Sequence, residues 1–202
     1  DVTGKGISDK SNKWIKSEDK IELNSIYGYS AINRWNYSAL LNLKTQFDNG
    51  FKNDTLLISS GLSPAVLTSS VGLEFKTKNF STLFSCLTGK TTYCLDKRLR
   101  KKGNFSFQED DKAWDFSLGS YIKVFFQKDI FKNVNVLFKL DFFYDYEKKS
   151  LLDTDISNEI FINMKVNKFL TAFIDLQATI DKDFSTKLQY KERMGISIPL
   201  TF

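Results

Sequence analysis

The sequence predicts an all-β protein, specifically an antiparallel up-and-down transmembrane β-barrel, and three observations lead to that fold. Nine segments alternate between polar and apolar residues with a period of two, as half-buried strands do. The connections between these segments are alternately short and long, as they are in outer-membrane barrels. Aromatic residues gather near both ends of the segments, where a bilayer has its two interfaces.

Composition narrows the functional classes. The chain has 202 residues and a formal charge of +5, and we expect residues 1–202 to form a single domain. It contains no histidine, which excludes a Ser-His-Asp triad and histidine zinc sites. We therefore expect no enzyme activity, no cofactor and no metal. Mean hydropathy is −0.29, and no apolar run of about 18 residues predicts a transmembrane helix.

The first four predicted strands cover residues 20–31, 35–47, 65–76 and 80–86. The first three each place large apolar residues at every second position, whereas the facing of the fourth is ambiguous. The apolar faces of the first three comprise Ile21, Leu23, Tyr27, Tyr29 and Ala31; then Trp35, Tyr37, Ala39, Leu41, Leu43 and Phe47; then Ala65, Leu67, Val71, Leu73 and Phe75.

The last five predicted strands cover residues 114–126, 134–146, 155–166, 170–180 and 192–202. Their apolar faces comprise Trp114, Phe116, Leu118, Ile122, Val124 and Phe126; Val134, Val136, Phe138, Leu140, Phe142, Tyr144 and Tyr146; Ile156, Ile160, Ile162, Met164 and Val166; Leu170, Ala172, Ile174, Leu176, Ala178 and Ile180; and Met194, Ile196, Ile198, Leu200 and Phe202. Most of the nine strands have 11–13 residues. This exceeds the usual length in globular sheets and suits a membrane crossing.

The connections assign direction to the strands. Short connections are expected at 32–34, 77–79, 128–133 and 167–168, and long ones at 48–64, 88–113, 147–153 and 181–188. If Phe202 lies on the periplasmic side, every short connection is periplasmic and every long loop extracellular. Residues 1–19 are then an external loop segment. Nine strands would leave one sheet edge unpaired, so we expect an odd number of further strands upstream, or another segment, to complete the wall.

Two aromatic girdles are predicted, and an aliphatic belt about 25 Å tall would separate them. The periplasmic-side girdle comprises Tyr27, Tyr29, Trp35, Tyr37, Phe75, Phe80, Phe126, Phe169 and Phe202. The outer girdle comprises Phe47, Trp114, Phe116, Tyr144, Tyr146 and Tyr190.

The opposite strand face is polar and would line the lumen. Its charged residues are Lys44, Glu74, Lys76, Lys123, Lys139, Asp141, Glu159, Lys165, Asp175, Lys191 and Arg193. They could form a charged pore or an ion-pair network that fills the lumen. Inward aromatic residues favour the filled lumen; these are Tyr121, Phe125, Phe143, Phe161 and Phe173. Asp141 and Asp175 could act as an acid–base pair, but nearby lysines favour salt bridges.

Two further features lie in the predicted loop 88–113. If a hairpin turned at residues 89–91, Cys86 and Cys94 would face each other and could form a disulfide; the alternative is two free thiols. The segment 95–103 concentrates basic residues, which could contact lipid phosphates or a protein, or be a solvated loop. No basic strip with interleaved aromatic residues predicts nucleic-acid binding.

Several segments resemble a Bacteroidota outer-membrane β-barrel family catalogued as a domain of unknown function. They are "SEDKIELNSIYGYSAINRWNYSALLNLKTQF", "LSPAVLTSSVGLEFKTKNFSTLFSCLTGKTT", "KDIFKNVNVLFKLDFFYDY", and "MKVNKFLTAFIDLQATID" with the last strand. The chain resembles the C-terminal three quarters of that family. The resemblance implies a signal peptide and about three more strands upstream, hence about twelve strands in all, an even number. Cys86 and Cys94 depart from the family pattern.

These observations predict an integral outer-membrane protein of a Gram-negative bacterium, with extracellular long loops and a periplasmic C-terminus. We expect a non-enzymatic subunit of a larger envelope assembly, which binds other envelope proteins through its long loops. Membrane lipids and lipopolysaccharide would surround it, and the barrel-assembly machinery would fold it. The alternatives are a small passive or substrate-selective channel and a soluble β-sandwich binding module.

Overall fold

The computed structural model describes residues 5–7, 14–16, 19–52, 56–100, 112–148, 154–167, 169–181, 183 and 185–198. The chain is all-β, and nine antiparallel strands form its main sheet. In chain order these strands are β3 (Ile21–Ile32), β4 (Trp35–Thr45), β7 (Ala65–Lys76), β8 (Phe80–Tyr93), β9 (Trp114–Phe131), β10 (Val134–Asp145), β11 (Asp155–Asn167), β12 (Leu170–Asp181) and β13 (Ser185–Ser197).

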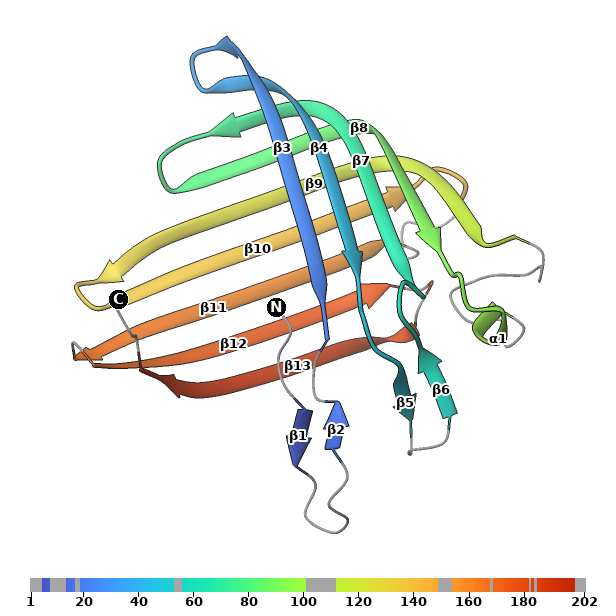
Figure 1. Ribbon diagram of the computed structural model, residues 1–202. Helices are drawn as coiled ribbons and strands as arrows, with labels where there is room; N and C mark the ends of the chain where they lie inside the picture. The colour runs from blue at the N-terminus through green and yellow to red at the C-terminus, as the bar shows by residue number, and fades with distance from the viewer. Residues whose placement is uncertain are drawn as a thin grey trace. The chain divides into compact units, whose positions relative to one another are not determined.

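The strand order of the sheet is β13-β12-β11-β10-β9-β8-β7-β4-β3 (Figure 1). Each strand therefore pairs with the preceding and following strand of this set, which confirms the up-and-down prediction. Among the described residues, β3 and β13 are the two ends of the order and do not pair with each other. No helix in the described ranges has the length and apolar character that crossing a bilayer requires.

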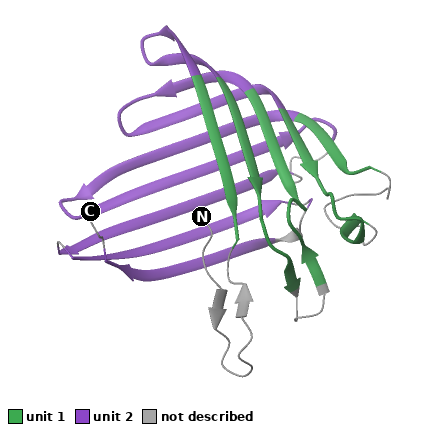
Figure 2. Ribbon diagram, in the orientation of Figure 1, with its two compact units in different colours: residues 1–27, 39–70, 89–118 green, residues 28–38, 71–88, 119–202 purple. Residues whose placement is uncertain are grey.

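Contacts divide the chain into two compact units (Figure 2). Unit 1 consists of residues 1–27, 39–70 and 89–118. Unit 2 consists of residues 28–38, 71–88 and 119–202.

Unit 2 contains the most regular part of the sheet, from β9 to β13. Each neighbouring pair is antiparallel, with a register that continues over most of the strand length. Every described strand of unit 2 belongs to this one sheet. The unit is therefore a single layer, with one face of alternate residues on each side.

All four short turns lie in unit 2. Asn33 and Arg34 join β3 to β4, and Asn33 has a positive φ of 55°. Asparagine tolerates this left-handed conformation better than most residues, which explains a two-residue turn there. The other three turns connect β7 to β8, β9 to β10, and β11 to β12.

Backbone hydrogen bonds place these turns beside the neighbouring strands in a stepped arrangement. Lys76 N donates to Arg34 O at 2.9 Å, one residue before the next turn begins. Gln127 N donates to Asn79 O at 2.9 Å, although β9 continues to Phe131. Lys165 N donates to Asn133 O at 2.8 Å, and β11 continues to Asn167. Each hairpin thus extends past the preceding one.

Unit 1 contains short elements that the sequence did not predict. The expected loop 48–64 forms a hairpin of β5 (Gly50–Lys52) and β6 (Leu56–Ser59). A short helix, α1 (Lys97–Arg100), follows β8 and contacts β6. Leu57, Cys94 and Leu99 are buried together and form the small core of this region.

Several predicted boundaries differ from the structure. Within residues 1–19, which were expected to be an external loop segment, β1 (Lys5–Ile7) pairs with β2 (Trp14–Lys16); the external position of this segment stays a prediction. Strand β8 runs through residues 89–91, where a hairpin was expected. The predicted long loop 181–188 is a tight connection, because β12 ends at Asp181 and β13 begins at Ser185.

Candidate functional site

The two faces of unit 2 differ sharply in chemistry, and the polar face is held together by ion pairs between neighbouring strands. Lys123 Nζ on β9 lies 2.9 Å from Asp141 Oδ1 on β10. Lys139 Nζ on β10 lies 3.2 Å from Glu159 Oε1 on β11. Asp175 on β12 and Arg193 on β13 form the third pair.

The strand register explains these pairs. The two members of each pair sit directly opposite each other on neighbouring strands, and opposite side chains in a sheet lie close enough to interact. Asp175 is only 1% exposed, and Gln177 Nε2 donates to its Oδ2 at 3.1 Å. The polar face therefore carries charge that its own strands neutralise.

Aromatic side chains fill the space between these pairs. Tyr121 and Phe143 are buried opposite each other, and the Tyr121 hydroxyl donates to Asp141. The rings of Phe161 and Phe173 stack with their centroids 5.8 Å apart. These contacts fill part of the polar face, and the filled lumen itself stays a prediction.

The other predicted lumen residues divide into three groups. Glu74 is buried and accepts a hydrogen bond from Ser38 Oγ at 3.1 Å. In unit 1, Lys44 lies 3.9 Å from Glu22. Lys191 is opposite Gln177 on the polar face, whereas Lys76 and Lys165 lie at the turn end of unit 2.

The opposite face of unit 2 is almost entirely apolar from β10 to β13. On this face, the residues that pair across neighbouring strands are uncharged, with the exception of Glu192. The aliphatic members are Val134, Val136, Leu140, Ile156, Ile160, Ile162, Met164, Ala172, Ile174, Leu176, Ala178, Ile180, Met194 and Ile196. Because the described strands of unit 2 form one layer, none of the described residues of this unit covers this face. Met194 is 69% exposed and Ile196 is 70% exposed.

The two predicted aromatic girdles stay a prediction, but some of their rings lie close together. Close to the turns of unit 2, the Trp35 and Phe75 rings lie 5.2 Å apart, and Phe75 and Phe80 lie 6.5 Å apart. At the loop end of unit 2, Tyr144 and Tyr146 lie 6.1 Å apart. The remaining described members are Tyr27, Tyr29, Tyr37, Phe47, Trp114, Phe116, Phe126, Phe169 and Tyr190. Phe202 lies outside the described residues.

Phe126 and Tyr190 were assigned to opposite girdles, but the strand register places them on adjacent rows of the sheet. Phe126 lies on the row of Phe138, and Tyr190 on the next row, with Ala178. Their assignment to opposite girdles depends on how far each row lies from the turn of its own strand, and it stays a prediction. Phe126 is five residues from the end of β9 at Phe131, whereas Ala178 is eight residues from the start of β12 at Leu170.

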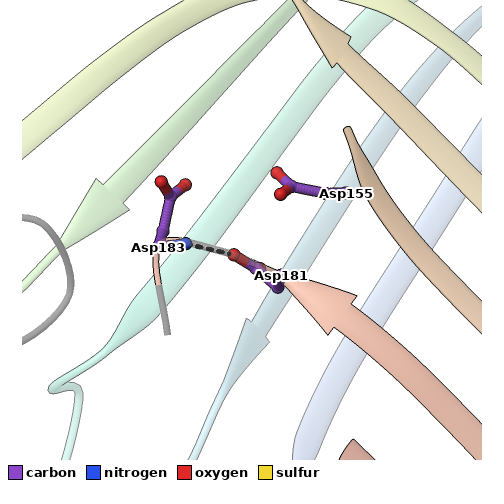
Figure 3. Close-up of side chains that lie close together, drawn as sticks. All are labelled: Asp155, Asp181 and Asp183. Carbon is purple, nitrogen blue, oxygen red and sulfur yellow. Dashed lines mark hydrogen bonds between the residues drawn. The ribbon is translucent and has the colours of Figure 1, made fainter. Parts of the chain in front are cut away.

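Asp155, Asp181 and Asp183 form an acidic cluster at the loop end of unit 2. Their carboxylate oxygens lie within 4.8 Å of one another (Figure 3). Asp183 N donates to Asp181 Oδ1 at 3.0 Å, and Lys148 Nζ lies 3.0 Å from Asp183 Oδ1. Carboxylates are ligands that hard cations prefer; here a lysine already supplies positive charge. The sequence analysis did not identify this cluster because its members meet only through strand pairing.

The cysteines are two free thiols, so the disulfide alternative is wrong. Cys86 is exposed and Cys94 is buried. One continuous strand, β8, runs from Cys86 almost to Cys94, and eight extended residues span about 26 Å. A disulfide requires Cα atoms closer than about 7 Å.

The region around Cys94 is a compact loop cluster, which we define as Leu57, Ser63, Cys94, Leu99 and Arg100. The fully buried Ser63 Oγ accepts hydrogen bonds from Leu95 N and Asp96 N, both at 2.9 Å. Arg100 Nη1 donates to Cys94 O at 2.6 Å. Burial raises the pKa of the Cys94 thiol above its ordinary value of 9.0.

The basic segment 95–103 is described up to Arg100. Asp96 accepts a hydrogen bond from Arg98 N at 2.9 Å and thereby caps α1. The Arg98 guanidinium, with Nη2 2.7 Å from Asp96 Oδ2, lowers the pKa of Asp96 from 3.8 to about 2. This part of the segment is therefore an ordered helical turn, in which Arg98 is paired.

The sequence analysis missed a set of basic residues at the turns of unit 2. Arg34, Lys78 and Lys132 lie in the connections themselves, and Lys128 lies near the end of β9. A signal was present, because every short connection includes or adjoins a basic residue. It was overlooked because the connections were read only for their length.

Comparison with known protein families finds a match for the N-terminal part of the chain. A family model described as "Protein of unknown function (DUF3078)" matches residues 4–51. No curated protein and no solved structure matches the chain. The expected similarity to a domain of unknown function is thus confirmed for the part of the chain that contains β1 to β4.

Proposed function

We propose that the nine-stranded sheet is part of the wall of an outer-membrane β-barrel in a Bacteroidota bacterium, with a structural and non-enzymatic role. The observation that carries the proposal is the contrast between the faces of unit 2. The aliphatic face has no cover within its unit, whereas the ion pairs and the buried Tyr121 and Phe143 lie on the opposite face. A water-soluble sheet would bury the aliphatic face instead.

Energetics support lipid as the solvent of that face. A large aliphatic side chain gains about 1.5–3 kcal/mol when it leaves water. The aliphatic rows are half-buried on β10 to β12 and exposed at Met194 and Ile196 on β13, so leaving them in water would be costly. Strand length also fits: the 12 residues of β12, at about 3.3 Å each and tilted by about 40°, cover roughly 30 Å.

The stepped turns support a closed wall. Closing a sheet into a barrel requires tilted strands whose register is staggered in one direction, and each short hairpin of unit 2 extends past the one before it. The edges of β3 and β13 also need partners, because unpaired backbone groups are costly in hydrocarbon. We propose that about three further strands fill this gap, for about twelve in all, since bacterial barrels have even numbers.

Within the outer membrane, we propose a role as an accessory or structural subunit of an envelope assembly. The loop cluster of unit 1 supports this role, because it is a folded element with its own buried core. Several apolar side chains of the same unit remain exposed and could contact an envelope protein; they are Phe47, Phe51, Ile58, Leu62 and Leu95. The filled polar face argues against the alternative of an open channel, and we expect no conductance in planar bilayers.

Spin labelling tests the proposal. In a Cys86→Ala, Cys94→Ala background, a nitroxide is attached at Ile174→Cys or Leu176→Cys on the apolar face. The matched control is Thr179→Cys, on the polar face of the same strand. Power saturation in lipid vesicles then compares collision with oxygen, which concentrates in hydrocarbon, and with a water-soluble nickel chelate.

We expect strong oxygen contact and little nickel contact at positions 174 and 176, and the opposite preference or low contact at position 179. High nickel contact at positions 174 and 176 would place that face in water. Low contact with both reagents at these positions would indicate protein packed on the face, as in a β-sandwich. Either of these results would overturn the proposal.

A further inference from the structure

The turn end of unit 2 is strongly basic. Its last strand residues and its connections carry six cationic side chains in the described ranges, against two acidic side chains, Glu74 and Asp129. We call the six residues the turn-end cations: Arg34, Lys76, Lys78, Lys128, Lys132 and Lys165.

These cations differ from those on the polar face of the same unit. Lys123, Lys139 and Arg193 each pair with a carboxylate on the neighbouring strand. By contrast, none of the turn-end cations forms an ion pair within the described part of the chain. Of the two described acids at this end, Glu74 accepts a hydrogen bond from Ser38 Oγ at 3.1 Å, and Asp129 accepts one from Asn135 Nδ2 at 2.8 Å.

The turn-end cations form one edge. Backbone hydrogen bonds join the segments that carry them: Lys76 to Arg34, Gln127 to Asn79, and Lys165 to Asn133. Their charges therefore accumulate along a continuous border, where each cation raises the affinity of its neighbours for an anion.

A pocket at this edge combines a cation with aromatic rings. Asn33, Arg34, Trp35 and Phe75 line an open cavity of about 610 Å³. The Trp35 ring lies 5.2 Å from the Phe75 ring. A guanidinium binds a phosphate with two parallel hydrogen bonds, and tryptophan prefers the level of lipid headgroups in a membrane interface.

The opposite end of unit 2 has the reverse character. In sequence, its two connections, residues 145–155 and 181–187, carry six acidic residues and four lysines. An anionic surface would therefore be attracted to the turn end and not to the loop end.

From this charge distribution we propose that the turn end of unit 2 binds the phosphate groups of anionic glycerophospholipids, with one headgroup held in the pocket at Arg34. The inference rests on the proposed function, because a membrane-spanning sheet places this edge at a lipid–water interface. It goes beyond that function by assigning a lipid class to one end of the protein. The aromatic rings would contact the glycerol and upper acyl region, while Arg34 binds the phosphate.

Lipid binding to the full chain in a neutral detergent tests the inference. The probes are dioctanoyl phosphatidylglycerol, dioctanoyl phosphatidylcholine, inorganic phosphate and a poly-glutamate peptide, each titrated by calorimetry. Arg34→Gln removes the pocket cation, and Lys78→Gln removes a neighbouring charge. Arg98→Gln is the matched control, because Arg98 is an exposed arginine in unit 1, far from the short turns in sequence.

We expect phosphatidylglycerol to bind at least tenfold more tightly than phosphatidylcholine, and the difference to shrink as salt rises. A surface cation contributes roughly fivefold to the binding of an anionic membrane, so Lys78→Gln should weaken phosphatidylglycerol binding by about that factor. Arg34→Gln should weaken it more, because the pocket is also lost. Arg98→Gln should leave binding unchanged.

Equal binding of the two lipids would overturn the inference, as would an unchanged affinity in both Arg34→Gln and Lys78→Gln. Tighter binding of inorganic phosphate or of poly-glutamate than of phosphatidylglycerol would show that the edge serves another anion. The spin-label experiment separates the two proposals. Labels at positions 174 and 176 that contact hydrocarbon would uphold the barrel even if lipid selectivity failed.

Discussion

Asp175 and Arg193 face each other across the last two strands of the sheet, and their side chains form an ion pair on its polar face. Arg193 Nε donates to Asp175 Oδ2 at 3.0 Å. The carboxylate is buried, whereas the arginine side chain is 37% exposed. The pair therefore places one charge inside the protein and leaves its partner at the border of that interior.

Replacing Arg193 by methionine should destabilise unit 2. The substitution keeps much of the side-chain volume but leaves a buried carboxylate without its counter-ion. Removing one member of a fully buried pair costs about 3–5 kcal/mol. We expect about 2 kcal/mol here, because Arg193 is partly exposed and water can reach the site. Urea unfolding in detergent micelles, followed by tryptophan fluorescence, measures the change.

Lys139→Met is the matched control for that experiment. Lys139 pairs with Glu159 in the same register, but both side chains are more accessible to water. An exposed pair contributes about 0–1 kcal/mol, so this variant should lose much less stability than Arg193→Met. Equal losses in the two variants would contradict the assignment of Asp175 as the buried charge.

A methyl group at Gly119 should also destabilise unit 2. A Cβ at this position would collide with the Tyr144 backbone carbonyl oxygen and lie 2.9 Å from the Phe143 ring. Backbone cannot move aside without breaking strand pairing, so Gly119→Ala should cost about 3 kcal/mol, at the upper end of the overpacking range. Thermal unfolding in micelles checks the prediction.

Gly195→Ala separates the backbone effect from simple crowding. Its Cβ would meet only the Phe173 ring, at 2.7 Å, and a side chain can rotate away. We expect a loss of about 1 kcal/mol. If Gly195→Ala proved as damaging as Gly119→Ala, the close approach of the β9 and β10 backbones would not be the reason for glycine at position 119.

Ser63→Ala should loosen the loop cluster of unit 1. Its hydroxyl accepts two backbone hydrogen bonds in a fully buried position, and a buried donor left without a partner costs about 1–3 kcal/mol. In a Cys86→Ala background, Cys94 should then react with maleimide several times faster. Ser69→Ala, at an exposed serine in the same unit, should leave the rate unchanged; a comparable increase there would refute the role of Ser63.

The ionisation of the Cys94 thiol should occur at higher pH in the folded chain, because the thiol is buried. Because burial raises the pKa of this thiol, the folded chain holds it protonated to higher pH than the unfolded chain does. The associated stability is complete below about pH 9 and is lost as the pH rises through the folded-state pKa. In the Cys86→Ala background, the rate of reaction with a thiol reagent should have a midpoint displaced upward relative to the urea-unfolded chain. Coincident midpoints would contradict the prediction.

Local alternation predicted most of the sheet. The apolar residues of β10 to β13 repeat at every second position, interrupted at Asn158 and Glu192. All four strands were predicted, although β13 begins at Ser185, before the predicted start at residue 192. The pairs Lys123–Asp141 and Lys139–Glu159 join residues that had been assigned to one face. Period two fixes the face of a residue, and pairing of consecutive strands then fixes its neighbours.

The prediction failed where the period is broken or where distant segments meet. In β8, Ser85 and Thr88 are both buried, and Cys86 and Leu87 between them are both exposed. This shift in facing made residues 89–91 resemble a turn. The loop cluster was not predicted for another reason. Ser63 and Leu95 are distant in sequence, and their contact depends on how the two loops fold together.

The two outer strands of the sheet have a consequence for biogenesis. Each has a row of peptide groups with no described partner on one side, and hydrocarbon offers no hydrogen bonds to such groups. If this sheet is part of a barrel wall, its insertion into the lipid and the pairing of its two outer strands must occur in one concerted step. A variant that folds but cannot seal should therefore stall at the membrane surface and be degraded there.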